Sequence, residues 1–189
     1  MIMISALRWV TQRLSHVVLH PLFARWRIVA GRVPWFKRDC NEDPPIAPQT
    51  GPLMTLEEVN AFLLRDFPQI APGREFIVEA VGPLSARMRL CASEKHLRPG
   101  GTISGPSMFA LADVTLYVAI LAQIGPVALA VTTNLNINFL RRPAPGDLIA
   151  DCRLLKLGKR LAVGEVFLHS PGDEDPVAHA TGTYSIPPG

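Results

Sequence analysis

A single carboxylic acid, Asp113, lies within a long apolar stretch, and it is the side chain of this sequence best placed for chemistry. Between Met108 and Ile124 the only other ionisable group is the phenol of Tyr117. Burial in such surroundings disfavours the charged carboxylate unless a hydrogen-bond donor or a positive partner compensates. Perturbed acids of this kind cluster at functional sites, so Asp113 is a candidate general base or nucleophile.

A glycine-bearing turn, residues 100–106, precedes the apolar stretch. Proline suits the first helical position because its missing N–H would be unpaired there, so Pro106 predicts the start of a helix. The free N–H groups of a first helical turn carry the positive end of the helix dipole and attract negative groups. An acid about two turns further on faces the side of the helix start, which predicts a base near an oxyanion-stabilising N–H.

The segments around this turn predict one long buried helix and an antiparallel sheet. Thr55-Leu56-Glu57-Glu58 matches the capping-box pattern and opens a short helix that runs to about Asp66. Alternating apolar residues separated by turn residues predict six strands, at residues 75–81, 84–91, 127–140, 148–157, 161–170 and 177–186. We therefore expect an α+β fold in which an antiparallel sheet wraps one face of the central helix.

The chain divides by composition into residues 1–53 and residues 54–189. The first part carries a formal charge of +4 and ends in a proline-rich linker, whereas the second carries −1. Residues 1–38 contain no acid and show an amphipathic stripe. This pattern fits an organellar targeting segment, a membrane-surface helix, or translated sequence upstream of a start at Met54. We expect residues 54–189 to form the globular domain and the protein to act in the cytoplasm.

Charge and residue usage argue against several other classes of protein. The charge of the globular part is too balanced for a nucleic-acid binder. The three cysteines and five histidines show no disulfide or metal-ligand spacing, so we expect neither a disulfide framework nor a metal. The apolar stretch has the length of a membrane span, but Asp113, Gln123 and the Gly125-Pro126 break favour a core helix. We expect no stable membrane insertion.

Five short motifs follow one another in the globular part. They are Gly100–Ile120, Thr132–Pro143, Gly146-Asp147, Gly158–Arg160 and Ala178–Tyr184. In this order and spacing they resemble the hotdog-fold acyl-CoA thioesterases of the phenylacetate-degradation (PaaI-like) type, over about residue 53 to the C-terminus. The resemblance implies a sheet curled around one long helix and an acyl-CoA site at the interface of a homodimer or dimer of dimers. It implies no metal and no redox cofactor, with coenzyme A as product.

The resemblance also assigns roles to single residues. The family carries a Gly-Thr-x-His-Gly-Gly run at the helix start and an Asp nine residues after the His. Here Ser104 stands in the His place, Pro106 replaces the second Gly, and Asp113 follows Ser104 by nine residues. The resemblance implies that Asp113 is the general base or nucleophile, that the Gly105 N–H polarises the thioester carbonyl, and that Thr132 helps to orient the water.

Further polar residues near the expected site are candidates for substrate binding. Arg98 stands where relatives often carry an Asn or a similar polar residue near the thioester. A cation there is able to contact a phosphate or an acidic acyl group. Arginine and lysine side chains at the rim of a site suit the phosphates of coenzyme A, although exposed strand ends carry such charges in any case. The remaining candidates are Ser104, Asn134, Arg141, Lys159 and Arg160.

Two functions of different classes stay open. One is an acyl-CoA thioesterase that releases a free acid and coenzyme A. The other is a non-catalytic acyl-CoA or acyl-thioester binding protein on the same fold, because the turn reads Ser-Gly-Pro. A hotdog dehydratase requires a His where Ser104 stands. A serine triad with His96 or His169 lacks the usual nucleophile elbow, and Ser104 and Ser107 suit helix capping instead.

Overall fold

The computed structural model describes residues 51–70 and 75–188. The acid-free N-terminal stretch lies outside these residues, and its interpretation stays a prediction. In chain order the elements are α1 (Leu56–Asp66), the 3₁₀ turn η1 (Pro68–Ile70), β1 (Phe76–Gly82), β2 (Ser85–Leu90), the 3₁₀ turn η2 (Glu94–His96), β3 (Leu97–Arg98), β4 (Thr102–Ile103), α2 (Gly105–Ile124), β5 (Val131–Phe139), β6 (Leu148–Leu157), β7 (Leu161–His169) and β8 (Ala178–Ser185).

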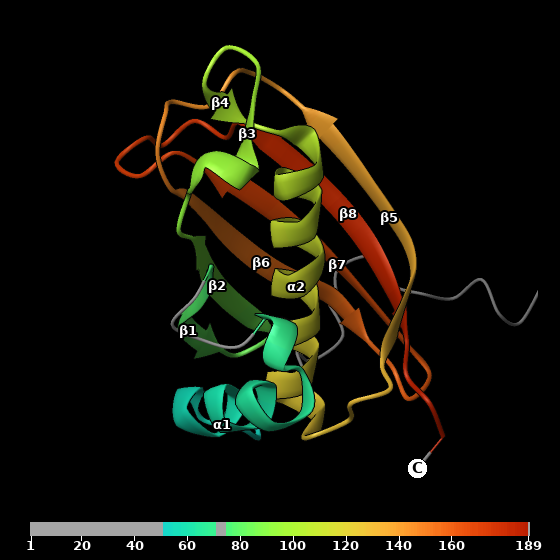
Figure 1. Cartoon of the computed structure of the whole chain (residues 1–189). Helices are drawn as coiled ribbons and strands as arrows, with labels where there is room; N and C mark the ends of the chain where they lie inside the picture. The colour runs from blue at the N-terminus through green and yellow to red at the C-terminus, as the bar shows by residue number, and fades with distance from the viewer. Residues whose placement is uncertain (1–50, 71–74, 189) are drawn as a thin grey trace, which may run out of the picture. The chain divides into compact units, whose positions relative to one another are not determined.

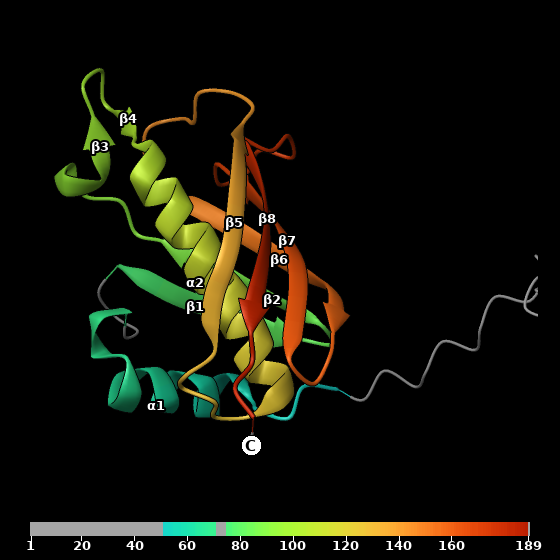
Figure 2. The ribbon, with the colours of Figure 1, turned by 90° about the vertical axis from the view of Figure 1, so that its right-hand side faces the viewer.

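One antiparallel sheet of six strands forms the body of the described part, in the order β1-β2-β6-β7-β8-β5. Figure 1 shows α2 lying along one face of this sheet. Figure 2, turned by 90°, shows β5 and β8 passing along one side of the helix while β1 and β2 lie at the other. The prediction of an antiparallel sheet wrapped around one central helix, the hotdog architecture, is confirmed.

The helix α2 forms the core because it is apolar on nearly every side, as expected for a helix covered all round. By length and composition α2 would be able to cross a membrane. Its side chains instead pack against the sheet and α1, and most of those from Met108 to Ala122 are buried. The apolar stretch is therefore the core helix that the sequence favoured.

Two glycines allow α2 to lie close to the sheet. Gly164 on β7 and Gly182 on β8 are register partners in neighbouring strands. A Cβ atom added at either glycine would come within 2.6 Å of a side-chain methyl of Leu116 on α2. Contacts this short do not occur between real carbon atoms, so any larger residue would push the helix or Leu116 away from the sheet.

The helix α1 lies near the C-terminal end of α2, at the opposite end from the β3–β4 hairpin (Figures 1 and 2). The predicted capping box is present: the Thr55 hydroxyl accepts the N–H of Glu58, and the Glu58 carboxylate accepts the N–H of Thr55. Val59, Phe62 and Leu63 turn inward and are buried. This helix therefore covers the last turns of α2.

The short strands β3 and β4 form a hairpin next to the start of α2, which the alternation of apolar residues did not predict. Its turn uses Gly100 and Gly101 at φ values of 95° and 73°, a region that favours glycine. Ser104 is the N-cap of α2 and Gly105 is its first residue. The helix start predicted at Gly105-Pro106 is therefore confirmed, with Pro106 in the first turn of α2.

The strand expected from residue 127 begins later, at Val131. Residues 127–130 form a turn that is closed by a hydrogen bond of 3.2 Å from the Ala130 N–H to the Val127 carbonyl. Gly125 and Pro126 stop the helix, and this turn brings the chain back to the sheet. Alternation alone therefore overestimated the strand by four residues at its start.

Substitution of Gly182 by Ala is expected to destabilise the fold because the new methyl group would meet Leu116 and Leu135. We expect the free energy of unfolding to fall by about 1–3 kcal/mol, measured by urea denaturation followed by circular dichroism. Gly51→Ala is the control, because no other heavy atom lies within 4 Å of a Cβ at that position. Equal midpoints for the two variants would contradict the tight contact between α2 and the sheet.

Candidate active site

The Asp113 carboxylate is held by two hydroxyl groups at the wall of a cavity of about 440 Å³. Thr132 on β5 donates to Asp113 Oδ1 over 2.7 Å, and Tyr184 on β8 donates to the same oxygen over 2.7 Å. The Tyr184 hydroxyl also lies 2.9 Å from the Asp113 carbonyl oxygen. Oδ2 has no hydrogen-bond partner within the described residues, and Asp113 is one of the residues that line the cavity.

Tyr184 is the residue of this site that sequence reasoning did not select. Burial, with the charge of Asp113 next in importance, raises the pKa of its phenol. The hydroxyl therefore stays protonated and remains a donor. A signal was present in the sequence, since Tyr184 closes the last of the family motifs. Tyr184 is 71 residues from Asp113 in the sequence, however, and only the strand pairing brings the two together in space.

The two hydroxyl donors explain how an acid persists in an apolar helix. Hydrogen bonds from hydroxyl groups replace part of the hydration that a carboxylate loses on burial. Thr115, another hydroxyl residue of α2, donates to the Leu111 carbonyl instead, over 2.6 Å. Thr132 therefore contacts Asp113 directly, whereas its predicted role in orienting water stays a prediction.

The first turn of α2 offers one free backbone N–H, that of Gly105. Pro106 has none, the N–H of Ser107 points to the Ser104 hydroxyl, and that of Met108 bonds to the Ser104 carbonyl. The N–H of Gly105 has no acceptor within the described residues. Since a Cβ at Gly105 would lie 3.2 Å from the Phe139 ring, the residue is also confined from the side of β5.

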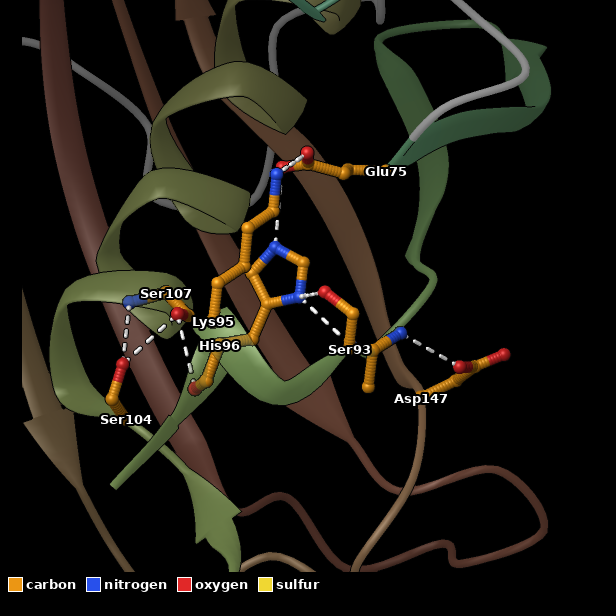
Figure 3. A network of polar contacts seen from close by, with 8 residues as sticks. Glu75, Ser93, Lys95, His96, Ser104, Ser107 and Asp147 are labelled. Atoms are coloured by element: carbon orange, nitrogen blue, oxygen red, sulfur yellow. Dashed lines mark hydrogen bonds and ion pairs between the residues drawn. The ribbon is translucent and has the colours of Figure 1, made fainter. Parts of the chain in front are cut away.

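A buried histidine, His96, anchors this turn from behind (Figure 3). Its backbone carbonyl accepts the Ser104 N–H over 2.8 Å and the Ser107 hydroxyl over 3.2 Å. Its ring lies between Ser93, whose N–H is 3.0 Å from Nδ1, and Glu75, whose Oε2 is 3.2 Å from Nε2. His96 therefore links the helix start, through its backbone carbonyl, to Glu75, the residue before β1, through its ring.

The contacts of the His96 ring define its protonation. Because a backbone N–H donates to Nδ1, that nitrogen is the acceptor and Nε2 carries the hydrogen, which it donates to Glu75. Burial, helped by the charge of Lys95, lowers the pKa of His96. The ring is therefore neutral near pH 7, and a second proton would remove the acceptor that the Ser93 N–H needs.

Gly105 lines a second cavity of about 510 Å³, between the β3–β4 hairpin and the segment that follows β5. Arg98, Arg141 and Arg142 lie in its wall together with the ring of Phe139. Asp113 belongs to the other cavity, eight residues further along α2, a rise of about 12 Å. Within one chain, therefore, the fold does not bring Gly105 or Arg98 onto the Asp113 carboxylate.

The remaining basic candidates divide between two ends of the sheet. Arg141 follows the end of β5 at Phe139, which pairs with Ala178, whereas Lys159 and Arg160 precede Leu161, which pairs with Ser185. These positions are separated by most of the length of β8. Within one chain, Arg141 and the Lys159-Arg160 pair therefore do not meet at one phosphate.

The predicted role of Asn134 receives no support from its position. Leu135 and Ile137 on the same strand pack against the core, so Asn134 lies on the opposite, exposed face of β5. It lines neither the Asp113 cavity nor the Gly105 cavity. Its contact with a substrate stays a prediction.

Neither a serine triad nor a metal centre is formed by the described residues. Ser104 and Ser107 contact the backbone carbonyl of His96 and each other, and the His96 ring faces Ser93 and Glu75. The capping role expected for Ser104 is present. Over residues 51–70 and 75–188, no group of three His, Cys, Asp or Glu side chains is arranged to hold a metal ion.

Comparison with known proteins identifies the family. The sequence profile of the Thioesterase superfamily matches residues 100–177, which include the Gly105 turn, Asp113 and Thr132. A protein of Pseudomonas aeruginosa that is provisionally assigned as an esterase is 33% identical to this chain over 120 residues. The match covers 59% of this chain and 88% of that relative. The chain therefore belongs to the Thioesterase superfamily, and the resemblance to hotdog thioesterases is confirmed.

Solved structures agree with this assignment. A provisionally assigned thioesterase of Silicibacter sp. TM1040 is 51% identical, with a TM-score of 0.68 over 75% of this chain and 97% of that one. The phenylacetic acid degradation protein PaaI of Thermus thermophilus is 27% identical, with a TM-score of 0.53 over 60% of this chain and 94% of that one. Membership of this family supports the general activity of an acyl-thioester hydrolase for this protein.

Replacement of His96 by Asn should destabilise the protein more at pH 7.5 than at pH 5. Asn keeps an acceptor near Ser93 but loses the contact with Glu75. Because the folded state lowers the pKa of His96, the unfolded state binds the extra proton first as the pH falls. The stabilisation of the folded state by the neutral His96 ring is therefore complete above the pKa that His96 has in the unfolded chain, near 6.5. It is lost as the pH falls through the lower pKa that His96 has in the folded protein.

Urea denaturation of wild type and His96→Asn at both pH values measures this difference. Lys156→Gln, an exposed change on β6, serves as the control and should leave the pH dependence unchanged. A destabilisation of the Asn variant that is equal at pH 7.5 and pH 5 would contradict the neutral-ring contact.

Proposed function

We propose that this protein is an acyl-CoA thioesterase, in which Asp113 drives hydrolysis and the Gly105 N–H polarises the thioester carbonyl. The observation that carries the proposal is the Asp113 carboxylate. One oxygen is held by the Thr132 and Tyr184 hydroxyls, the other has no hydrogen-bond partner among the described residues, and Asp113 lines a cavity. A carboxylate fixed in this way is able to accept a proton or attack a carbon without losing its position.

The proposed reaction needs water and these protein groups, and neither a metal nor a redox cofactor. With Asp113 as base, water adds to the thioester carbon while the carboxylate takes its proton. The carbonyl oxygen becomes negative and is stabilised by the Gly105 N–H. The carbon–sulfur bond then breaks, the sulfur takes the proton from the Asp113 carboxyl group, and coenzyme A leaves as a thiol.

Direct attack by Asp113 is the second route. The carboxylate oxygen would form an anhydride with the acyl group and expel coenzyme A, and water would then hydrolyse the anhydride. Both routes use the free Oδ2 and the same oxyanion donor. They differ in whether the acyl group is bonded to the protein between the two steps.

A homodimer completes the proposed site. Gly105 and Asp113 of one chain are about 12 Å apart along α2, too far to act on a single carbonyl carbon. The edge strand β5 carries the exposed Val131 and Phe139, at 56% and 52% exposure, and such an unpaired edge favours association with another chain. A second copy across β5 would supply Asp113 to the Gly105 turn of the first.

The other predicted partners and locations follow from this proposal. Acyl-CoA would be the small-molecule substrate, with Arg98, Arg141, Lys159 and Arg160 available to its charged groups. A cytoplasmic location and the absence of nucleic-acid partners stay predictions of the sequence. Ser104 contributes by capping α2 and so orienting Gly105.

Asp113→Asn should abolish most of the hydrolysis of acyl-CoA. Release of free thiol from short, medium, long and aromatic acyl-CoAs should fall by roughly 10²-fold or more in kcat, because the amide neither accepts the proton nor attacks. Tyr184→Phe should cause a smaller loss, since Thr132 still holds the carboxylate. Asp66→Asn is the control: this acid at the edge of the same cavity pairs with Arg65.

The outcome separates the two functional classes. If Asp113→Asn turns over as fast as wild type, the proposed mechanism is wrong. If no acyl-CoA is hydrolysed by wild type and yet acyl-CoA binds and is released intact, the protein is a binding protein on the same fold.

Mixed dimers should regain activity if the site is shared between two chains. Gly105→Val places a branched side chain against Phe139 and blocks the space beside the N–H, so this variant and Asp113→Asn should each be inactive as homodimers. A heterodimer of the two, isolated through different affinity tags, would contain one intact site and recover about half of the wild-type rate. Circular dichroism checks that each variant is folded. An inactive heterodimer would contradict the shared site.

A further inference from the structure

The wall of the cavity beside Gly105 carries positive charges that nearby acidic side chains of the same chain balance only in part. Within one chain, no acid lines its wall, which contains Arg98, Arg141 and Arg142. Arg141 is neutralised by Asp173, at 2.9 Å, and by Asp175, at 3.5 Å. The charges of Arg98 and Arg142 have no acidic partner among the described residues.

These two arginines come from opposite walls of the cavity. Arg98 ends β3 in the hairpin, and Arg142 lies in the segment after β5. Arg142 is oriented by a hydrogen bond of 2.7 Å from its Nη2 to the Gly100 carbonyl, a neutral group that leaves the charge uncompensated. Two like charges facing one cavity repel each other, and an anion between them would remove that cost.

We propose that this cavity binds a carboxylate at the far end of the acyl group, so that the preferred substrates are coenzyme A thioesters of short dicarboxylic acids. This inference rests on the proposed function, since it takes Gly105 as the residue that holds the thioester carbonyl. Arg98 and Arg142 are then the residues that determine specificity.

The size of the cavity favours an acyl carboxylate over the phosphates of coenzyme A. A sphere of 510 Å³ is about 10 Å across, whereas the arm between the thioester sulfur and the first phosphate spans roughly 15 Å when extended. A thioester carbonyl held at Gly105 therefore leaves the phosphates of an extended arm outside this cavity. A carboxylate four or five carbons from the thioester fits within it.

The rest of the wall suits the methylene groups of such a chain. Ile103 and Met108 are buried beside Gly105, and the exposed ring of Phe139 lies across from them. Apolar contacts of this kind accept a short hydrocarbon segment, and the arginines then fix its charged end by paired N–H···O bonds.

The test compares two substrates of equal chain length that end in a carboxylate or a methyl group, glutaryl-CoA and pentanoyl-CoA. Because both contain the same coenzyme A, its phosphate contacts cancel in the ratio of their kcat/KM values. We expect wild type to prefer glutaryl-CoA by roughly ten- to a hundredfold. Arg98→Gln and Arg142→Gln should each reduce this preference at least about fivefold, mainly through glutaryl-CoA. Lys156→Gln, outside the cavity, should leave it unchanged.

Binding of non-hydrolysable analogues separates this inference from the proposed function. Calorimetry with the thioether forms of glutaryl-CoA and pentanoyl-CoA should show the same preference and the same loss in both arginine variants, even in a protein that hydrolyses neither substrate. A preference in binding without turnover would overturn the proposed thioesterase activity and keep the anion site.

Three results would overturn the anion site. The first is a wild type that does not distinguish the two acyl groups, and the second is a failure of both analogues to bind. The third is an equal loss for both substrates in Arg98→Gln and Arg142→Gln, which would assign the arginines to coenzyme A or to a carboxylate of a second copy of this chain.

Discussion

The burial of one apolar helix, α2, against a single sheet is the constraint on which the rest of this structure depends. The helix is covered by strands along its length and by α1 near its end, and Gly164 and Gly182 bring it within van der Waals contact of the sheet. A helix so enclosed cannot tolerate an unpaired charge. The one acid that it carries, Asp113, is therefore placed where two strands supply hydroxyl donors.

This arrangement gives the catalytic candidate its geometry at little cost in stability. Each hydrogen bond to a charged group contributes about 1.5–3 kcal/mol, which offsets part of the lost hydration of the carboxylate. Both donors bind the same oxygen, so the other stays free. The same contacts that make burial possible thus define which oxygen is available to react.

A separate part of the structure positions the Gly105 N–H, the proposed oxyanion donor. The β3–β4 hairpin and the buried His96 hold the start of α2, and the capping of Ser107 leaves Gly105 as the free N–H of the first turn. The two parts are joined by the rigid helix between them. That rigidity also keeps them apart within one chain, which is the physical argument for a site shared by two copies.

The sequence by itself determined the elements and the main acid. The apolar stretch, the capping box and the alternation in most strands are local patterns, so the core helix, α1 and the sheet class were predictable from them. The family motifs identified Asp113, Gly105 and Thr132, and the family itself was confirmed.

Only the tertiary structure decided which groups touch. It placed Tyr184 on Asp113, put Gly105 and Arg98 in a different cavity from that acid, and neutralised Arg141 but not Arg98. It also set Lys159 and Arg160 at the opposite end of the sheet from Arg141. These outcomes depend on strand order and register, which join residues far apart in the chain, and a local pattern contains no information about them.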